Sequence, residues 1–320
     1  MQSACMISGR CQSYCDPECP MRLHSLRVLW LVAIVIWAAC SSSPAQPAAS
    51  KHVVTMLDCS GLPCVDLSAA GRTLRLLIDT GNPNSVLDQA IAQQLGLPLE
   101  PIVRNGKATG FSRTKLSHAR ISDLELDLPM TVMDISGYVR SNQMPKADGT
   151  LGYKAFEGRA LRLDYPHKSV EISGPQSDCT GPCGKLSLIT FGQHGPPILV
   201  ASGFDVNGKP LTAQIDTLFA GTLLVYPTLV EKPGLSALAK TQQKRSFPYT
   251  DGGVDMFEAP GTTQGFAGTL LERDAPVYFA TPDVHQPDGM FDGTVGDALL
   301  RKFAVTLDLG DMTIAIDGSH

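Results

Sequence analysis

Hydrophobic and polar positions alternate along short stretches for most of this chain, and residues typical of turns separate the stretches. The compact apolar run at residues 74–78 predicts one strand. Two further apolar runs, at residues 197–202 and 211–215, flank the dipeptide Asn207-Gly208. Because Asn-Gly between apolar runs is a strong hairpin signal, these two runs predict a β-hairpin.

One short helix is expected among these strands. Residues 86–95 carry apolar side chains at helical spacing, and Gly96 and Pro98 follow as termination signals. Residues 160–172 and 303–316 each alternate like two strands around a turn. The pattern therefore predicts a mostly-β chain with short helices.

The chain contains an internal duplication. Residues 148–173 align without gaps with residues 292–317, at an offset of 144 positions. Upstream, residues 74–88 align with residues 211–225. Repeats of this length indicate two homologous lobes rather than a solenoid, whose period is about 20–50 residues. The identical positions of the downstream pair are Asp148, Gly149, Thr150, Gly152, Ala160, Leu163, Asp164 and Ile172.

The duplication also predicts the domain organisation. In the upstream alignment Asp79 falls over Asp216, and each follows an apolar strand. We expect an N-terminal lobe at residues 51–176 and a C-terminal lobe at residues 177–320. Residues 1–50 are expected to be dispensable for the fold.

Those first residues are typical of an export signal. Arg22 and Arg27 precede an uncharged apolar run at residues 28–39, which is shorter than the roughly 20 residues that span a bilayer. Cys40 then stands where a bacterial lipobox has its lipidated cysteine, whereas ordinary cleavage nearer Ala45 is the alternative. We expect an exported protein of the periplasm or cell envelope, in contact with the membrane only through this signal or a lipid anchor. A signal that stays attached as an anchor is the competing interpretation.

Four cysteines precede Met21, but their spacing is not that of a metal site, and Met21 itself resembles a conventional signal-peptide start. Four more follow the leader: Cys59, Cys64, Cys179 and Cys183. An even number of cysteines in an exported protein indicates disulfides. Three connectivities are possible, and we expect the local pairs, Cys59 with Cys64 and Cys179 with Cys183. A redox-active role is the alternative, although neither pair has the Cys-x-x-Cys spacing.

Composition, charge and the absence of other motifs argue against several classes of function. The chain is rich in turn residues, with 30 Gly and 23 Pro, and its net charge is −5 with no basic run. A nucleic-acid partner is not expected, because binding would need clustered Lys and Arg. The sequence contains no nucleophile elbow, phosphate-binding loop or zinc-protease motif, and no metal or organic cofactor is implied.

The repeated motifs resemble those of the aspartic peptidases, in both their retropepsin-like and pepsin-like forms. The resemblance rests on Ile78-Asp-Thr-Gly81 and on the apolar-Gly pairs of each half, Leu151-Gly152 and Val295-Gly296. It covers nearly all of residues 52–318. It implies a bilobal pepsin-like fold of two β-barrel-like lobes, with the active cleft between them and a peptide or protein as substrate. Because both aspartates are in one chain, a monomer would suffice.

The resemblance assigns catalysis to Asp79 and Asp216. Two carboxyl groups held a few ångströms apart cannot both ionise, so they share one proton. The ionised partner would activate a water, and the protonated partner would polarise the scissile carbonyl. Thr80, Gly81 and Thr217 are expected to support the pair, with the two threonines bonding across the lobe interface.

One departure from the family pattern leaves two functions open. Leu218 follows Asp216-Thr217 where the pattern has Gly, and Phe219 replaces a small residue. The second motif is therefore either adapted or inactive. We expect an active endopeptidase, and the alternative is a non-catalytic two-lobed protein that binds peptides or serves as a structural component of the cell envelope.

A flap over the cleft is expected between the two motifs of each half. Residues 104–112 are the first candidate, with Gly110 allowing a bend and Phe111 replacing the usual aromatic, unless Phe111 is a plain core residue. Residues 249–253 or 261–268 are the candidates in the second half.

The repeated aspartates of the downstream alignment are expected to accept local backbone hydrogen bonds rather than to act as further catalytic acids. They are Asp148, Asp292, Asp164 and Asp308.

Overall fold

The chain divides into two compact units, Met1–Ala48 and Ala49–His320. The computed structural model describes residues 50–135, 146–176, 179, 181–190, 195–226, 243–249, 252–280 and 290–318, all of which belong to the second unit. The apolar leader run and Cys40 therefore lie outside the described residues. So do residues 250 and 251, within one of the two flap candidates of the second half.

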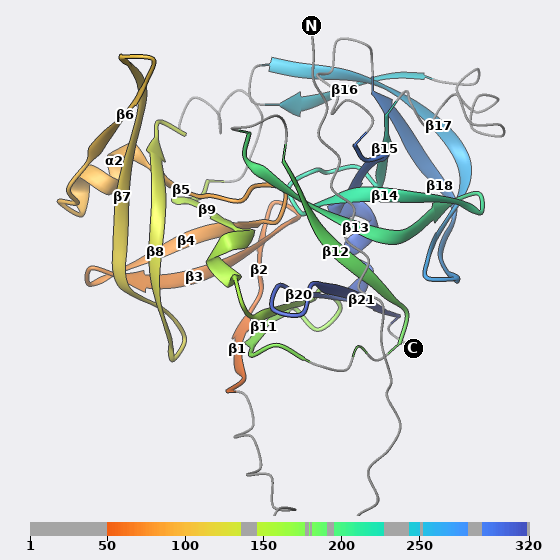
Figure 1. The fold of residues 1–320 in the computed structure, drawn as a ribbon, viewed down its shortest axis with the longest axis horizontal. Helices are drawn as coiled ribbons and strands as arrows, with labels where there is room; N and C mark the ends of the chain where they lie inside the picture. Colours follow the sequence, from red (N-terminus) through yellow and green to blue (C-terminus); the bar gives the residue numbers. More distant parts are fainter. Residues whose placement is uncertain are drawn as a thin grey trace, which may run out of the picture. The chain divides into compact units, whose positions relative to one another are not determined.

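The first half of this unit contains a closed barrel (Figure 1). Its strands pair in the order β2-β3-β4-β9-β5-β8-β7-β6, and β3 also pairs with β7. The six strands from β3 to β7 in that order therefore form a closed ring. The bounds are β2 (Leu57–Cys59), β3 (Leu62–Ala69), β4 (Arg72–Asp79), β5 (Ser85–Asp88), β6 (Glu100–Arg104), β7 (Lys107–Ile121), β8 (Leu124–Met133) and β9 (Gly149–Gly152).

The second half repeats this strand order. Its strands pair as β12-β13-β14-β19-β15-β18-β17-β16, and β13 also pairs with β17. Each strand thus has a counterpart ten numbers earlier in the first half. The bounds are β12 (Cys183–Thr190), β13 (Pro197–Val206), β14 (Lys209–Asp216), β15 (Leu223–Val225), β16 (Gln243–Tyr249), β17 (Gly252–Phe266), β18 (Thr269–Ala280) and β19 (Gly293–Gly296).

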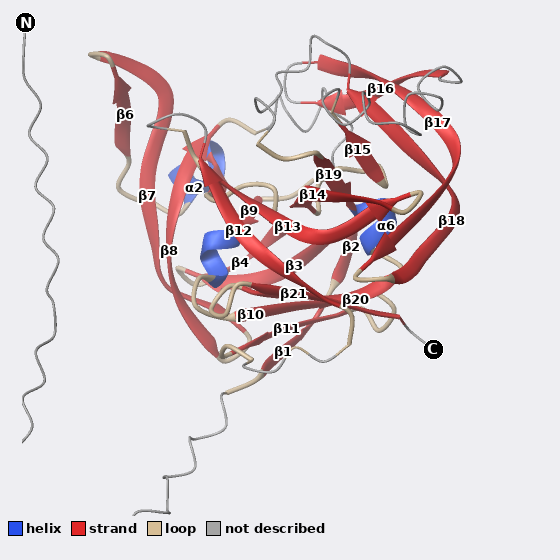
Figure 2. Ribbon diagram, turned by 45° about the vertical axis from the view of Figure 1, so that its right-hand side comes forward, coloured by secondary structure: helices blue, strands red, loops and turns tan. Residues whose placement is uncertain are grey.

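A third group of strands joins the two halves in the order β1-β11-β10-β20-β21-β12 (Figure 2). The central pair, β10 with β20, is antiparallel and aligns Arg162 with Thr306, which are equivalent positions of the duplication. The register is therefore symmetric about this pair. The bounds are β1 (His52–Thr55), β10 (Ala160–Asp164), β11 (Ser169–Ser173), β20 (Phe303–Asp308) and β21 (Thr313–Gly318).

The mostly-β prediction is confirmed, and so is the hairpin at Asn207-Gly208, where both residues adopt positive φ between β13 and β14. Within the described residues the helices are short: α2 (Gln89–Gln94), α6 (Asp297–Leu300) and the 3-10 turn η1 (Tyr153–Phe156). Across the same residues, none of the helices has both the length and the apolar character needed to cross a membrane.

The predicted start of the first helix, at Val86, is wrong. Val86 and Leu87 belong to β5, which pairs with β8 and β9. The helix begins after Asp88, whose side chain accepts hydrogen bonds from the N–H groups of Ala90 and Ile91. Apolar residues at these spacings fit a buried strand as well as a helix, and here the neighbouring strands and the N-cap decide.

Both predicted local disulfides are confirmed. Cys59 is bonded to Cys64, and Cys179 to Cys183.

One hydrophobic core runs through both halves and includes Leu76 and Ile78 of β4 as well as Ile215 of β14. The ends of β4 and β14 are thus anchored by burial immediately before Asp79 and Asp216.

Candidate active site

The candidate site forms where two apolar strands end. In the first half β4 ends at Asp79 and runs parallel to β9, with Asp79 opposite Gly152. In the second half β14 ends at Asp216 and runs parallel to β19, with Asp216 opposite Gly296. The apolar-Gly motif is thus the strand beside each aspartate.

The two glycines are required because a loop crosses directly over each of them. A Cβ at Gly152 would lie 2.5 Å from the carbonyl carbon of Asn84, and a Cβ at Gly296 would lie 2.3 Å from the carbonyl oxygen of Gly221. The preceding residues Leu151 and Val295 are fully buried in the core. Their side chains pack in the hydrophobic core and are not exposed at the surface.

Each aspartate is held by two backbone N–H groups of the turn that follows it. The carboxyl group of Asp79 accepts from Gly81 and Asn82. Oδ1 of Asp216 accepts from Leu218 at 2.9 Å and from Phe219 at 3.2 Å. Replacing Gly by Leu at position 218 therefore preserves the backbone donor.

The loop of the first half lies against the carboxyl group of the second. A Cβ on Gly81 would lie 2.4 Å from Cγ of Asp216, so only glycine fits there without displacing that carboxyl group. In addition, the side-chain amide of Gln214 donates to the carbonyl oxygen of Gly81 at 2.9 Å. These contacts bring the two aspartate loops together from positions 137 residues apart.

Burial raises the pKa of both carboxyl groups, and the negative charge of Asp216 adds to the rise at Asp79. Asp79 is 9% exposed, and its pKa is raised well above the ordinary value by burial and then by the negative charge of Asp216, against the two backbone donors. The pKa of Asp216 is raised by burial, and its two backbone donors lower it. One proton is therefore favoured on the pair over a range of pH.

The two threonines exchange hydrogen bonds between the halves. The N–H of Thr80 donates to Oγ1 of Thr217 at 3.1 Å, and the N–H of Thr217 donates to Oγ1 of Thr80 at 3.2 Å. Each hydroxyl group donates in turn to the opposite strand, to the carbonyl oxygens of Ile215 and Ile78. Both side chains are fully buried, so this reciprocal network fixes the relative positions of the two strand ends.

Leu218 and Phe219, the departures from the family pattern, both have defined packing partners. Leu218 packs against a small buried cluster that includes the Cys59–Cys64 disulfide of the first half. Phe219 is 8% exposed and meets the ring of Tyr278 edge-on, with centroids 6.2 Å apart. The second motif is accordingly a packed structure that accommodates both larger side chains.

The sequence did not single out Gln214 or Tyr226. Gln214 bridges the halves as described, and its only signal was a polar residue two positions before Asp216 in an apolar strand. The hydroxyl of Tyr226 lies 3.3 Å from that of Thr294, and burial raises its pKa, with a smaller contribution from the negative charge of Asp216. Only the folded chain brings Tyr226 towards the carboxyl pair.

The repeated Asp-Gly-Thr aspartates bind backbone, as expected, but over a long range rather than locally. Oδ2 of Asp148 accepts from the N–H of Arg75, and Oδ2 of Asp292 accepts from the N–H of Thr212, both at 2.8 Å. Each donor lies four residues before its catalytic candidate. Asp164 and Asp308 do close local turns, and their acceptor bonds to His167 and Gly310 follow the prediction.

The flap candidate of the first half is a hairpin of β6 and β7 that turns at Asn105. Gly110 has a φ of +82° and lies with Phe111 in a bulge, because Ile102 alone faces residues 109–111. Phe111 is 42% exposed, so the interpretation as a core aromatic is wrong. In the second half β16 and β17 form the hairpin at the corresponding place in the strand order, which favours residues 249–253 over residues 261–268.

Asp297, directly after the second apolar-Gly pair, is a buried acid outside the carboxyl pair. It is fully buried, forms an ion pair with Arg301 one helical turn later, and lies near Tyr165. Burial raises its pKa to about 6, although the Arg301 guanidinium opposes the rise. The Asp-to-Arg spacing of four residues was the only sign of this pair in the sequence.

This raised pKa predicts a pH dependence of stability. The folded state favours the protonated form of Asp297. Its contribution to the free energy of unfolding is therefore fully present below the unfolded pKa near 4 and is lost as the pH rises through about 6. A shift of this size corresponds to about 3 kcal/mol. We expect Asp297→Asn to remove about that much of the decrease in unfolding free energy between pH 4 and 7, measured by urea denaturation. Asp311→Asn, an exposed turn residue, should retain the wild-type slope; equal slopes for wild type and Asp297→Asn would refute the prediction.

Among the described residues no group of three or more His, Cys, Asp or Glu side chains is arranged to hold a metal ion. One comparison with known proteins found a matching family, over part of the chain. Residues 65–155 match the family model described as aspartyl protease. That segment contains Asp79-Thr80-Gly81 and Leu151-Gly152, and the match supports a protease of the aspartyl class. No curated protein matches the chain.

Proposed function

We propose that the protein is an aspartic endopeptidase that hydrolyses peptide bonds with a water molecule activated between Asp79 and Asp216. The observation that carries the proposal is the pairing of the two aspartate loops. Each carboxyl group is buried and held by two backbone N–H groups, and each threonine bonds to the other half. The family match covers only the first of these loops.

We propose in addition a bilobal pepsin-like fold, with lobes at residues 51–176 and 177–320. Two features support it: the same strand order in both halves, and the symmetric register of β10 with β20. In such a fold the two aspartates lie at the interface of the lobes, and one chain supplies the whole site.

The chemistry follows from the single shared proton. The ionised carboxylate removes a proton from the water as it attacks the scissile carbonyl carbon, and the protonated carboxyl group donates to the carbonyl oxygen. The tetrahedral species then collapses as the leaving amine takes up a proton from the pair. No covalent intermediate forms. The rate of cleavage should therefore have a bell-shaped pH dependence. Its acidic limb should lie above the ordinary aspartate pKa of about 3.9, because the pKa values of Asp79 and Asp216 are both raised.

The packing of the second motif favours the active interpretation over the non-catalytic one. A decayed site would be expected to lose the backbone donors to Asp216 or the threonine network, and both are present. Leu218 and Phe219 are instead accommodated by neighbouring clusters.

The substrate is proposed to be an extended peptide or an unfolded protein segment, covered by the β6–β7 hairpin. Val103 and Phe111 are 59% and 42% exposed on this hairpin, an apolar surface that a bound peptide would cover.

We propose a monomeric enzyme exported to the periplasm or cell envelope, with Cys40 as the lipid attachment site. The two disulfides support an oxidising compartment.

The test is cleavage of a peptide library by the purified protein from pH 3 to pH 8, with products identified by mass spectrometry. We expect cleavage with a bell-shaped pH dependence and no requirement for added metal. Folded protein that cleaves no peptide at any pH would refute the proposal and favour a peptide-binding or structural role.

A further inference from the structure

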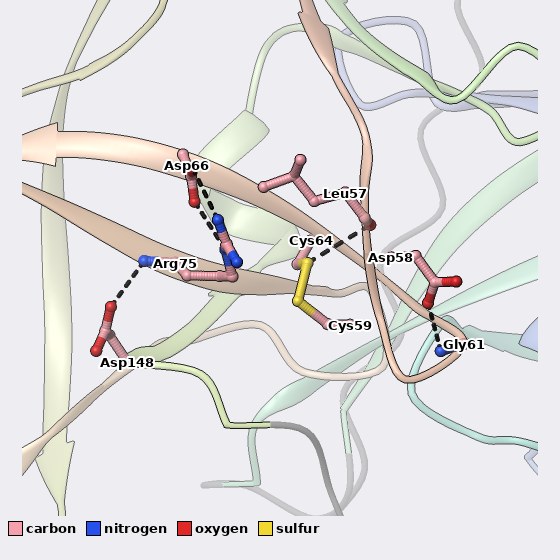
Figure 3. Close-up of a disulfide and its surroundings, with 8 residues drawn as sticks. All are labelled: Leu57, Asp58, Cys59, Gly61, Cys64, Asp66, Arg75 and Asp148. Carbon is pink, nitrogen blue, oxygen red and sulfur yellow. Dashed lines mark hydrogen bonds and ion pairs between the residues drawn. A yellow bond between two sulfur atoms is a disulfide. The ribbon is translucent and has the colours of Figure 1, made fainter.

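The disulfide of the first half closes a short hairpin that reaches the second half. Strand β2 pairs with the start of β3, and the turn between them is closed by Asp58, which accepts from the N–H of Gly61 at 2.6 Å (Figure 3). Cys59 and Cys64 are buried, with 7% and 0% exposure. We refer to residues 57–64 as the disulfide hairpin.

This hairpin contacts the second half at two places. Cys59, Leu62 and Cys64 of the hairpin form a buried cluster with Leu77 of β4, and Leu218 packs against this cluster. At its turn, Gly61 faces the guanidinium group of Arg301, which a Cβ at Gly61 would approach to 3.4 Å. The disulfide hairpin therefore touches both the residue after Asp216-Thr217 and the partner of Asp297.

The contact with Leu218 is adjacent to the carboxyl pair. The N–H of Leu218 donates to Asp216 Oδ1, so movement of Leu218 would move one of the two backbone donors that hold this carboxyl group. On the other side, Leu77 of the same cluster lies on β4, two residues before Asp79. A glycine at position 218 would have no side chain to form this contact.

We propose that the disulfide hairpin positions the Asp216 loop through Leu218, and that Leu218 is a positioning residue for catalysis rather than a sign of decay. This inference rests on the proposed peptidase function and adds to it a structural requirement that the family pattern lacks. The Cys59–Cys64 bond keeps the apolar surface beneath Leu218 in place, and Leu218 keeps its N–H on Asp216.

The second disulfide is a matched control within the same chain. Cys179–Cys183 closes a loop of similar length at the start of β12, beside β21. Cys179 is exposed, Cys183 is half-buried, and Gly181 between them faces Asp317 rather than an aspartate loop. Its removal should cost stability without disturbing the position of Asp216.

The experiment compares the double variants Cys59→Ser/Cys64→Ser and Cys179→Ser/Cys183→Ser, together with Leu218→Gly and Leu218→Met. We expect loss of the first disulfide to lower kcat by roughly 10–100-fold with a smaller change in KM, because misplacement of a reacting group by about 1 Å can have such an effect. Leu218→Gly should lower kcat to a similar extent. Leu218→Met preserves the apolar volume at this position and should therefore retain most of the wild-type kcat. Loss of the second disulfide should leave kcat and the pH profile unchanged.

A second readout separates this inference from the proposed function. The pKa of the Asp216 carboxyl group, measured by carbon NMR, should rise in Cys59→Ser/Cys64→Ser because a backbone donor that lowers it is displaced, and it should stay constant in Cys179→Ser/Cys183→Ser. A wild-type protein without peptidase activity would refute the function, while this titration would still test the positioning. If both double variants keep the wild-type kcat and Asp216 pKa, the inference is overturned.

Discussion

Asp79→Asn and Asp216→Asn are each expected to lower kcat/KM for peptide cleavage by roughly 10⁴-fold or more. Asparagine can accept hydrogen bonds like the acid, but it can neither take a proton from water nor give one to the carbonyl oxygen. Since the two carboxyl groups act as a unit, the double variant should be little worse than either single variant. Steady-state kinetics at the pH optimum measures all three.

Stability separates this effect from misfolding. Both carboxyl groups have raised pKa values, so their ionisation at neutral pH opposes folding, and neutral asparagine should leave the protein as stable as wild type or more so. Asp66→Asn makes the same chemical change at a surface ion pair with Arg75 and should keep full activity. Cleavage that survives both single substitutions would exclude the proposed mechanism.

Gly152→Ala and Gly296→Ala are each expected to destabilise the protein by about 3 kcal/mol or more. The added methyl group would fall at 2.5 Å from backbone atoms of Asn84 in one case and at 2.3 Å from the carbonyl oxygen of Gly221 in the other. Backbone of the crossing loop cannot rotate away as a flexible side chain can, so the loop and the adjacent aspartate must shift. Thermal unfolding should show a lower Tm, by about 5–10 °C.

The control for these substitutions is Gly318→Ala. A Cβ at Gly318 would meet no neighbouring atom within 4 Å, and this glycine does not adopt positive φ, so alanine should be neutral there. Similar loss of stability in all three variants would mean that the crossing loops are not the cause.

The sequence predicts those features that recur in both halves. The apolar strand before Asp79 and its repeat before Asp216 indicated the strands that position the carboxyl groups, and local cysteine spacing indicated both disulfides. The helix after β5 was misplaced because Val86 and Leu87 fit two periodicities, and the deciding contacts come from strands far away in sequence.

Contacts between the halves could not be read from the sequence. Leu218 looked like a defect because its packing surface, the disulfide hairpin, lies more than 150 residues earlier. Gln214 is likewise explained only by its partner in the folded chain, the carbonyl oxygen of Gly81. Side-chain packing over such separations has no periodic signal.

The most direct test of the central claim, that Asp79 and Asp216 act as one unit, is the pKa of Asp79 measured by carbon NMR in wild type and in Asp216→Asn. Removal of the second negative charge should lower the pKa of Asp79 towards the ordinary value, while Asp66→Asn should leave it unchanged. The measurement requires only folded protein, so it does not depend on a known substrate. A pKa of Asp79 that is the same with and without the carboxyl group of Asp216 would contradict the account.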